Sequence, residues 1–166
     1  MEYKELLLKT VFCTMACDGD IAEQEIQCVK KYVEKLKISD SLNVEETLKT
    51  YVSEINALKQ GFIDKYFKEI IEQSLSIEQE LEIAKASVDI ILADEVIEYS
   101  EIKFFKKLRS KLNVSDEEIC RVLPEDSDNP NIPTKEDFLA PDVFVKEEDF
   151  LINITFEEIN LESKAI

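Results

Sequence analysis

The sequence predicts an all-α fold, and three observations support that prediction. Residues 1–121 contain no proline, apolar residues recur there at helical spacing, and short polar breaks separate the apolar segments. The chain has 166 residues, of which 45% are hydrophobic, so it is long enough to bury one core. We expect a bundle of about seven helices, followed by a C-terminal extension of different character.

Each expected helix follows from a series of apolar residues that lie on one helical face. The series are Leu8, Val11, Phe12, Met15; Ile26, Val29, Val33, Leu36; Val44, Leu48, Tyr51, Ile55; Phe62, Tyr66, Ile70; and Ile77, Leu81, Ala84, Val88, Ile91. Breaks between helices are expected at 17–21, 38–41, 59–61, 74–76, 94–97 and 113–117. Within two of these breaks, Ser39 and Ser115 are predicted to be helix N-caps.

The chain changes character after Leu123. All four prolines lie between residues 124 and 141, which predicts a linker over 122–141. The acidic extension over 142–166 follows, and within it Phe150, Ile152, Ile154 and Phe156 alternate with the period of a strand. We therefore expect short strands in an extension that docks on the bundle or serves a partner.

Composition argues against several classes of function. A formal charge of −17 makes nucleic acid an unfavourable partner, because its phosphates would be repelled. The absence of histidine removes Ser-His-Asp and Cys-His catalysis and HExxH zinc sites. With only two glycines, the chain has no phosphate-binding loop motif. Paired carboxylates alone do not make an enzyme, so we expect a non-enzymatic protein.

The cysteines and the hydropathy pattern predict a cytoplasmic protein. Four cysteines, at positions 13, 17, 28 and 120, form no CxxC pair and are expected as small core residues, with a soft-metal or redox role as the alternative. The N-terminal segment lacks the layout of a signal peptide, and no apolar run reaches the ~20 residues that span a bilayer. Direct membrane insertion is not expected.

An internal repeat is the most informative feature. Residues 18–40 align without gaps on 94–116, and 10 of the 23 pairs are identical. The identical pairs are Asp18/Asp94, Ile21/Ile97, Glu25/Glu101, Ile26/Ile102, Lys30/Lys106, Lys31/Lys107, Lys35/Lys111, Leu36/Leu112, Ser39/Ser115 and Asp40/Asp116. The repeat predicts two related helical hairpins about a pseudo-dyad, each with a corner of the form D-x-x-I-x-x-x-E. The paired lysines are expected on solvated faces.

The corners resemble those of a known family. "MACDGDIAEQEI", then "ILADEVIEYSEI" followed by "KLRSKLNVSDEEI", resemble the TerB-like tellurite-resistance family, whose helical domain also occurs with DnaJ-type co-chaperones. In the second half Glu95 stands where the family pattern has glycine. The resemblance covers residues 1–121 and implies a bacterial stress-response module that acts through cation or protein contacts. A protein partner or self-association is expected.

The acids of the two corners are the candidate site. If the pseudo-dyad brings the corners together, six carboxylates would suit Ca²⁺, Mg²⁺ or Mn²⁺. They are Asp18, Asp20, Glu25, Asp94, Glu98 and Glu101. A standard EF-hand does not fit, because Thr14 and Ala16 would stand at its first ligand positions. The alternative to a cation site remains open: the acids are then helix caps, and the chain is a scaffold whose functional surface is the extension.

Overall fold

The computed structural model describes residues 2–17, 19, 21–40, 42–93, 97, 99–140, 156 and 159. Over those residues it is entirely helical, with eight α-helices, one 3₁₀ turn and no strand. The elements are α1 (Tyr3–Ala16), α2 (Glu23–Lys35), η1 (Ile38–Asp40), α3 (Val44–Leu58), α4 (Gln60–Glu72), α5 (Ile77–Ala93), α6 (Tyr99–Ser110), α7 (Asp116–Ile119) and α8 (Lys135–Leu139). The all-α prediction is confirmed.

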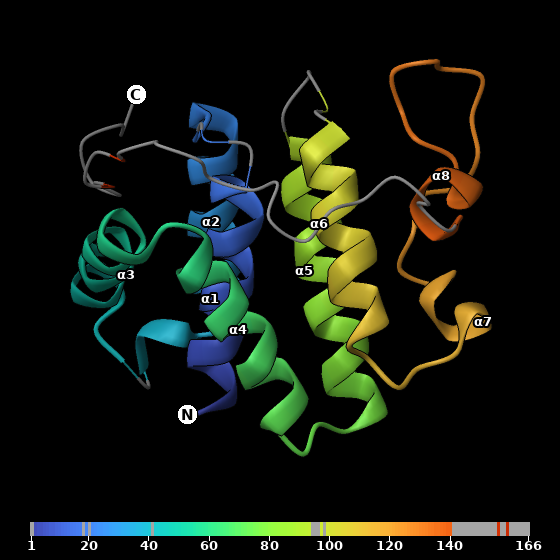
Figure 1. Ribbon diagram of the computed structural model, residues 1–166. Coiled ribbons are helices and arrows are strands. Elements are labelled where there is room, and N and C mark those ends of the chain that lie inside the picture. The colour runs from blue at the N-terminus through green and yellow to red at the C-terminus, as the bar shows by residue number, and fades with distance from the viewer. Residues whose placement is uncertain are drawn as a thin grey trace.

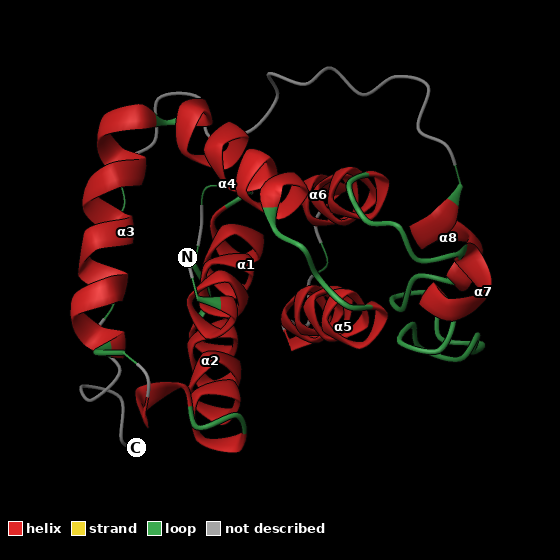
Figure 2. Ribbon diagram, turned by 90° about the horizontal axis from the view of Figure 1, so that it is seen from below, coloured by secondary structure: helices red, strands yellow, loops and turns green. Residues whose placement is uncertain are grey.

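The two hairpins of the repeat stand side by side at the centre of the molecule. Figure 1 shows α1 and α2 next to α5 and α6, with α1 packed along α5. Helix α3 lies beside the first hairpin and α7 and α8 lie beside the second, while α4 runs from the end of α3 across α1 toward α6 (Figure 2). A shift of 76 positions carries α1 onto α5 and α2 onto α6, so the equivalent helices α1 and α5 meet each other.

Helix α1 is the central helix of the bundle. Every residue from Leu6 to Ala16 is buried, which is typical of a helix covered on all sides. Its hydroxyl groups are satisfied internally, since Thr14 Oγ1 donates to the Thr10 carbonyl oxygen at 2.8 Å. The same hydroxyl lies 3.0 Å from Ser87 Oγ, at the point where α1 crosses α5. A small polar contact therefore lies within the otherwise apolar packing of the two halves.

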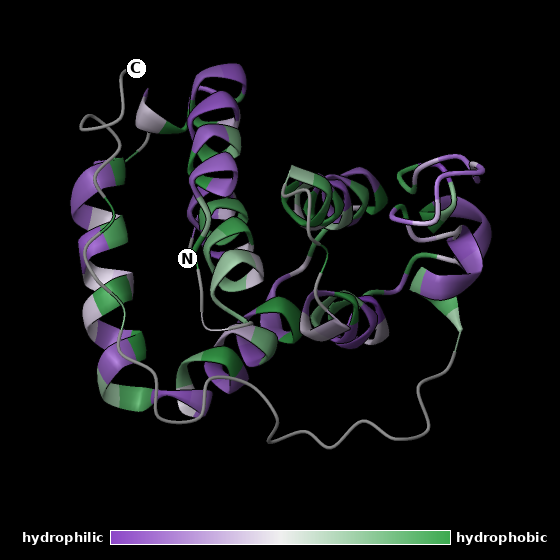
Figure 3. Ribbon diagram, turned by 90° about the horizontal axis from the view of Figure 1, so that it is seen from above, coloured by the Kyte–Doolittle hydropathy of each residue, from purple (hydrophilic) through white to green (hydrophobic). Residues whose placement is uncertain are grey.

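Helices α3 and α4 are amphipathic covers on this core. Hydrophobic residues of α3 lie on the side turned to α1, and hydrophilic residues lie on the outer side (Figure 3). The Tyr51 ring of α3 lies 5.5 Å from that of Phe12 and 5.9 Å from that of Phe62. A single residue, Lys59, joins the two helices with φ at 53°, a left-handed value that turns the chain sharply.

One of the two predicted N-caps is confirmed. Ser115 caps α7: its hydroxyl accepts from the Glu118 backbone N–H at 3.2 Å, and the Glu118 carboxylate accepts from Ser115 N–H at 3.1 Å. These hydrogen bonds from Ser115 lower the pKa of Glu118. The prediction for Ser39 is wrong, because Ser39 lies within η1 and Asn43 caps α3 by accepting from Glu46 N–H at 3.1 Å.

The segment predicted as a linker contains the short helix α8. Thr134 caps it, and Phe138 is fully buried with its ring 5.3 Å from that of Phe105. This segment is therefore fastened to α6. Further along, the Asn56 side chain of α3 pairs with both backbone polar groups of Phe156, at 2.7 and 3.0 Å. Of the extension, the structure describes Phe156 and Ile159. The strands predicted there otherwise fall on residues that the structure does not describe.

Among the described helices, none combines the length and the apolar character that crossing a bilayer requires.

Candidate functional site

The two acidic corners lie at the same end of the bundle. Helix α1 ends and α2 begins at this end, and α5 ends and α6 begins there too (Figure 1). Among the described residues, the corners meet where Cys17 Sγ donates to the carbonyl oxygen of Ser100 at 3.7 Å. Cys17 directly follows α1, and Ser100 is the second residue of α6. The fold thus places the two copies of the motif next to each other.

Of the six candidate ligands, the structure describes Glu25 and Glu101. Both are almost fully buried, at 2% and 1% exposure, and they occupy equivalent positions in the repeat. Glu25 Oε1 accepts a hydrogen bond from Ala22 N–H at 2.8 Å, which is half of a capping box because Ala22 has no side-chain acceptor to return it. The other four candidates, Asp18, Asp20, Asp94 and Glu98, lie outside the described residues.

The backbone of the first corner explains its glycine. Gly19 has φ at 86° and donates its N–H to the Ala16 carbonyl oxygen at 2.9 Å, which closes the end of α1. Glu95, its equivalent in the second half, is not among the described residues. Within the part of the chain that the structure describes, no three carboxylates or thiols are arranged to hold a metal ion. A cation site at this end would therefore need the other corner acids.

Two of the four thiols, Cys13 and Cys28, are not activated as nucleophiles. Burial raises the pKa of Cys13 well above its ordinary value. Burial, followed by the neighbouring Asp89 carboxylate, raises the pKa of Cys28 to about 11. Both thiols therefore stay protonated at neutral pH. The prediction that the cysteines are core residues is confirmed for Cys13 and Cys17, which are buried. Cys28 and Cys120 are partly exposed.

A groove lies on the surface between α2 and α5, and we call it the α2–α5 groove. Its volume is about 580 Å³. It is lined by Gln24, Gln27, Cys28, Lys31, Tyr32 and Lys35 of α2 and by Asp89, Leu92 and Ala93 of α5. The α2 residues follow one another at helical spacing, so they form a single stripe. The lysines were predicted on a solvated face, but the hollow beside them was not predicted.

The acid of the α2–α5 groove is already engaged. The Tyr32 hydroxyl donates to the Asp89 carboxylate, and Lys85 Nζ lies 3.3 Å from the same carboxylate. Lys31 and Lys35 are exposed, and no described carboxylate forms an ion pair with either of them. The groove therefore presents positive charge on an otherwise strongly acidic protein.

A second polar cluster fixes α4 against α1. Lys9 has a side chain that is 3% exposed, and it forms an ion pair with Glu69. Its Nζ also lies 4.8 Å from the centre of the Phe62 ring and 5.8 Å from that of Tyr51. A hollow of about 210 Å³ opens beside this pair. This pair was not predicted from the sequence, because its members lie 60 positions apart.

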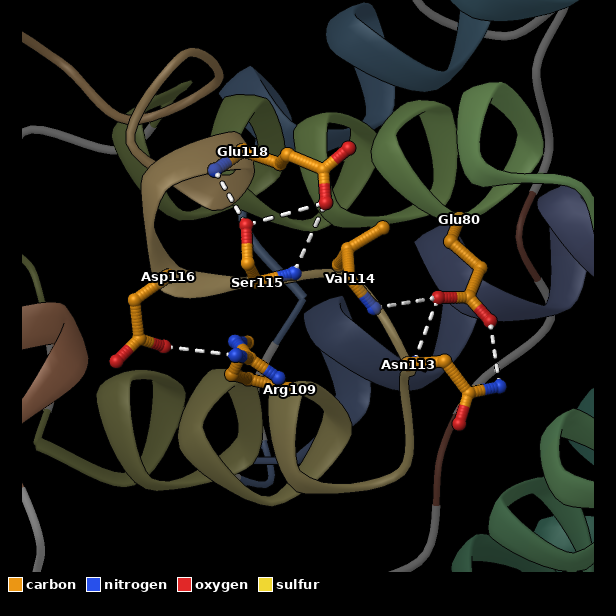
Figure 4. A network of polar contacts seen from close by, with 7 residues as sticks. All are labelled: Glu80, Arg109, Asn113, Val114, Ser115, Asp116 and Glu118. Atoms are coloured by element: carbon orange, nitrogen blue, oxygen red, sulfur yellow. Dashed lines mark hydrogen bonds and ion pairs between the residues drawn. The ribbon is translucent and has the colours of Figure 1, made fainter.

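A third polar network holds the end of the second hairpin (Figure 4). Glu80, which is buried, accepts from Asn113 N–H at 2.7 Å and from Val114 N–H at 3.0 Å. In the first half the equivalent residue is Lys4, whose Nζ donates to the Lys37 carbonyl oxygen at 3.4 Å. The equivalent turn is thus held in one half by a carboxylate that accepts hydrogen bonds and in the other by an ammonium group that donates one. We therefore interpret this network as structural.

Comparisons of the chain with family models, with curated proteins and with solved structures find no match.

Proposed function

We propose that this chain is a non-enzymatic, TerB-like stress-response module of the bacterial cytoplasm. It acts through a divalent cation held between its two corners and through contacts with a protein partner. The observation that carries the cation part is the contact between Cys17 and Ser100, since it brings two copies of one acidic motif to the same place. Glu25 and Glu101, buried at equivalent positions, support it further.

The chemistry of the donors fits a hard cation. Carboxylate oxygens are the ligands that Ca²⁺, Mg²⁺ and Mn²⁺ prefer, and two acidic corners side by side repel each other without a counter-charge. In this proposal Asp18, Asp20, Asp94 and Glu98 join the two buried glutamates as ligands. A bound ion would hold the two hairpins together at this end of the bundle.

The second candidate is a scaffold in which the corner acids are helix caps. The hydrogen bond from Ala22 to Glu25 favours it, because it gives one buried carboxylate a purely structural role. Phe156 docked on α3 shows that part of the extension is attached to the bundle, and the remainder would then be the functional surface.

Isothermal titration calorimetry separates the two candidates. The whole chain is titrated with Ca²⁺, Mg²⁺ and Mn²⁺, beside an Asp18→Asn/Asp94→Asn variant whose helicity is checked by circular dichroism. Saturable binding to the wild type that the variant loses supports a cation module. Absence of binding to a folded wild type refutes the cation part and favours caps. The matched control is Asp64→Asn/Glu78→Gln, which removes two exposed charges away from the corners.

A further inference from the structure

The repeat relates two grooves of the bundle to each other. Because a shift of 76 carries α1 to α5 and α2 to α6, the α2–α5 groove is equivalent to the groove between α6 and α1. That second groove is filled by α4. Tyr66 and Phe67 of α4 lie with their ring centres 6.1 and 5.4 Å from that of Phe104. The Tyr66 hydroxyl also lies 2.5 Å from Thr10 Oγ1 on α1.

The contacts of α4 fall on positions whose equivalents line the α2–α5 groove. Phe104, which stacks on Tyr66, corresponds to Cys28. Lys107, whose Nζ lies 5.4 Å from the centre of the Phe67 ring, corresponds to Lys31. One half of the molecule therefore shows how a helix sits on this surface. In the other half the same surface is hollow over the described residues.

We propose that the α2–α5 groove binds an acidic amphipathic helix of a partner protein, in the position that α4 takes on the equivalent groove. Aromatic or aliphatic side chains of that helix sit over Cys28 and Leu92, and its acidic residues face Lys31 and Lys35. This inference rests on the protein-contact part of the proposed function and does not depend on cation binding.

Charge and size both favour this occupant. The Asp89 carboxylate is already bound by Tyr32 and Lys85, so the two lysines supply the charge that a partner meets. The α2 stripe runs from Gln24 to Lys35, which at 1.5 Å per residue is roughly 16 Å, or about three turns of helix. A volume of about 580 Å³ accommodates several large side chains. Recognition of a helix in a groove by anchors at helical spacing is a common mode of binding.

The chain itself supplies a probe for this groove. The probe is a capped peptide of residues 60–73 that carries Lys65→Glu and Lys68→Glu to make it acidic, and Phe67→Trp as a reporter. Because the protein contains no tryptophan, all tryptophan emission comes from the peptide. Titration with the full chain is expected to shift the emission to the blue and to saturate, and the affinity should fall as salt rises from about 0.05 to about 0.5 M.

Two protein variants locate the binding. Lys31→Glu/Lys35→Glu reverses the charge of the groove and should weaken binding by roughly tenfold or more. Lys49→Glu/Lys68→Glu makes the same change of net charge at exposed positions of α3 and α4, and should change affinity by less than about twofold. A second peptide carries Tyr66→Ala and has Ala in place of the tryptophan, and its binding to the wild-type protein is followed by the anisotropy of a terminal dye. Its affinity should be as low as that of the first peptide for Lys31→Glu/Lys35→Glu.

Four results would overturn the inference. They are no binding of the acidic peptide, equal weakening by both protein variants, binding that neither variant weakens, and a dimer in sedimentation that only Lys31→Glu/Lys35→Glu dissociates. The third result would place the peptide elsewhere, for example in exchange with α4, and the fourth would make a second copy of this chain the occupant. Any of these, with saturable cation binding intact, would leave the cation part of the proposed function standing.

Discussion

Neutralising Glu69 provides a quantitative test of how α4 is held on the core. In the variant Glu69→Gln the Lys9 ammonium keeps its place, with a side chain that is 3% exposed, but loses its counter-charge. Removing one partner of a buried ion pair typically destabilises a protein by about 3–5 kcal/mol. We expect about 3 kcal/mol, at the low end, because the amide oxygen still accepts a hydrogen bond. The rings of Phe62 and Tyr51 also still face the cation.

The assay is urea unfolding followed by far-UV circular dichroism, with the free energy of unfolding extrapolated to water. A matched control is Glu54→Gln, since Glu54 pairs with Lys65 at 3.9 Å on the surface and its loss should cost less than about 1 kcal/mol. A second control, Lys9→Met/Glu69→Leu, removes both charges and should recover most of the stability. If Glu69→Gln costs no more than Glu54→Gln, the account of a buried pair is refuted.

Three further predictions concern buried polar groups. Glu80→Ala should lower the free energy of unfolding by about 3 kcal/mol in the same urea assay, because it leaves two backbone N–H groups without their acceptor. Glu80→Gln should cost about half as much. Equal costs for the two variants would contradict this. Tyr66→Phe should cost about 1 kcal/mol, because Thr10 still donates to the Leu6 carbonyl oxygen; a loss above about 3 kcal/mol would show that the hydroxyl does more. From neutral pH upward, stability should hold to about pH 9 and then fall, because burial raises the pKa of Cys13 and Tyr66 in the folded state while the unfolded chain ionises near their ordinary values of 9.0 and 10.0. Each group contributes about 1.4 kcal/mol per pH unit, and thermal melts that stay flat from pH 7 to pH 11 would disprove it.

The helical core could be predicted from the sequence because its signals are local and repeated. Apolar spacing marked each long helix, and the 76-residue repeat predicted that two hairpins pair. Ser39 and Ser115 were predicted as caps alike, and the residue three positions further on is what separates them: Glu118 follows Ser115 and completes a capping box. Ser39 is not followed by an acid at that spacing, whereas Asn43, the true cap, is followed by Glu46.

What the sequence did not predict depends on contacts between distant positions. The five residues of α8 are too few to show periodicity, and only the packing of Phe138 on Phe105 reveals why they are ordered. The α2–α5 groove lies between residues about 60 positions apart in the chain. It is open because α4 covers the equivalent surface between α6 and α1 instead. For the corner site the structure contributes the contact between Cys17 and Ser100 and the burial of two glutamates.

The most direct test of a groove that is open in the free protein and covered by a bound helix is the reactivity of Cys28. A Cys120→Ser variant leaves Cys28 as the partly exposed thiol, while Cys13 and Cys17 are buried. We predict that iodoacetamide modifies Cys28 in the native protein and that the rate rises with pH toward the pKa of about 11. A saturating amount of the acidic peptide should slow this reaction by roughly tenfold. A rate that the peptide leaves unchanged, or modification that occurs only on unfolding, would contradict the account.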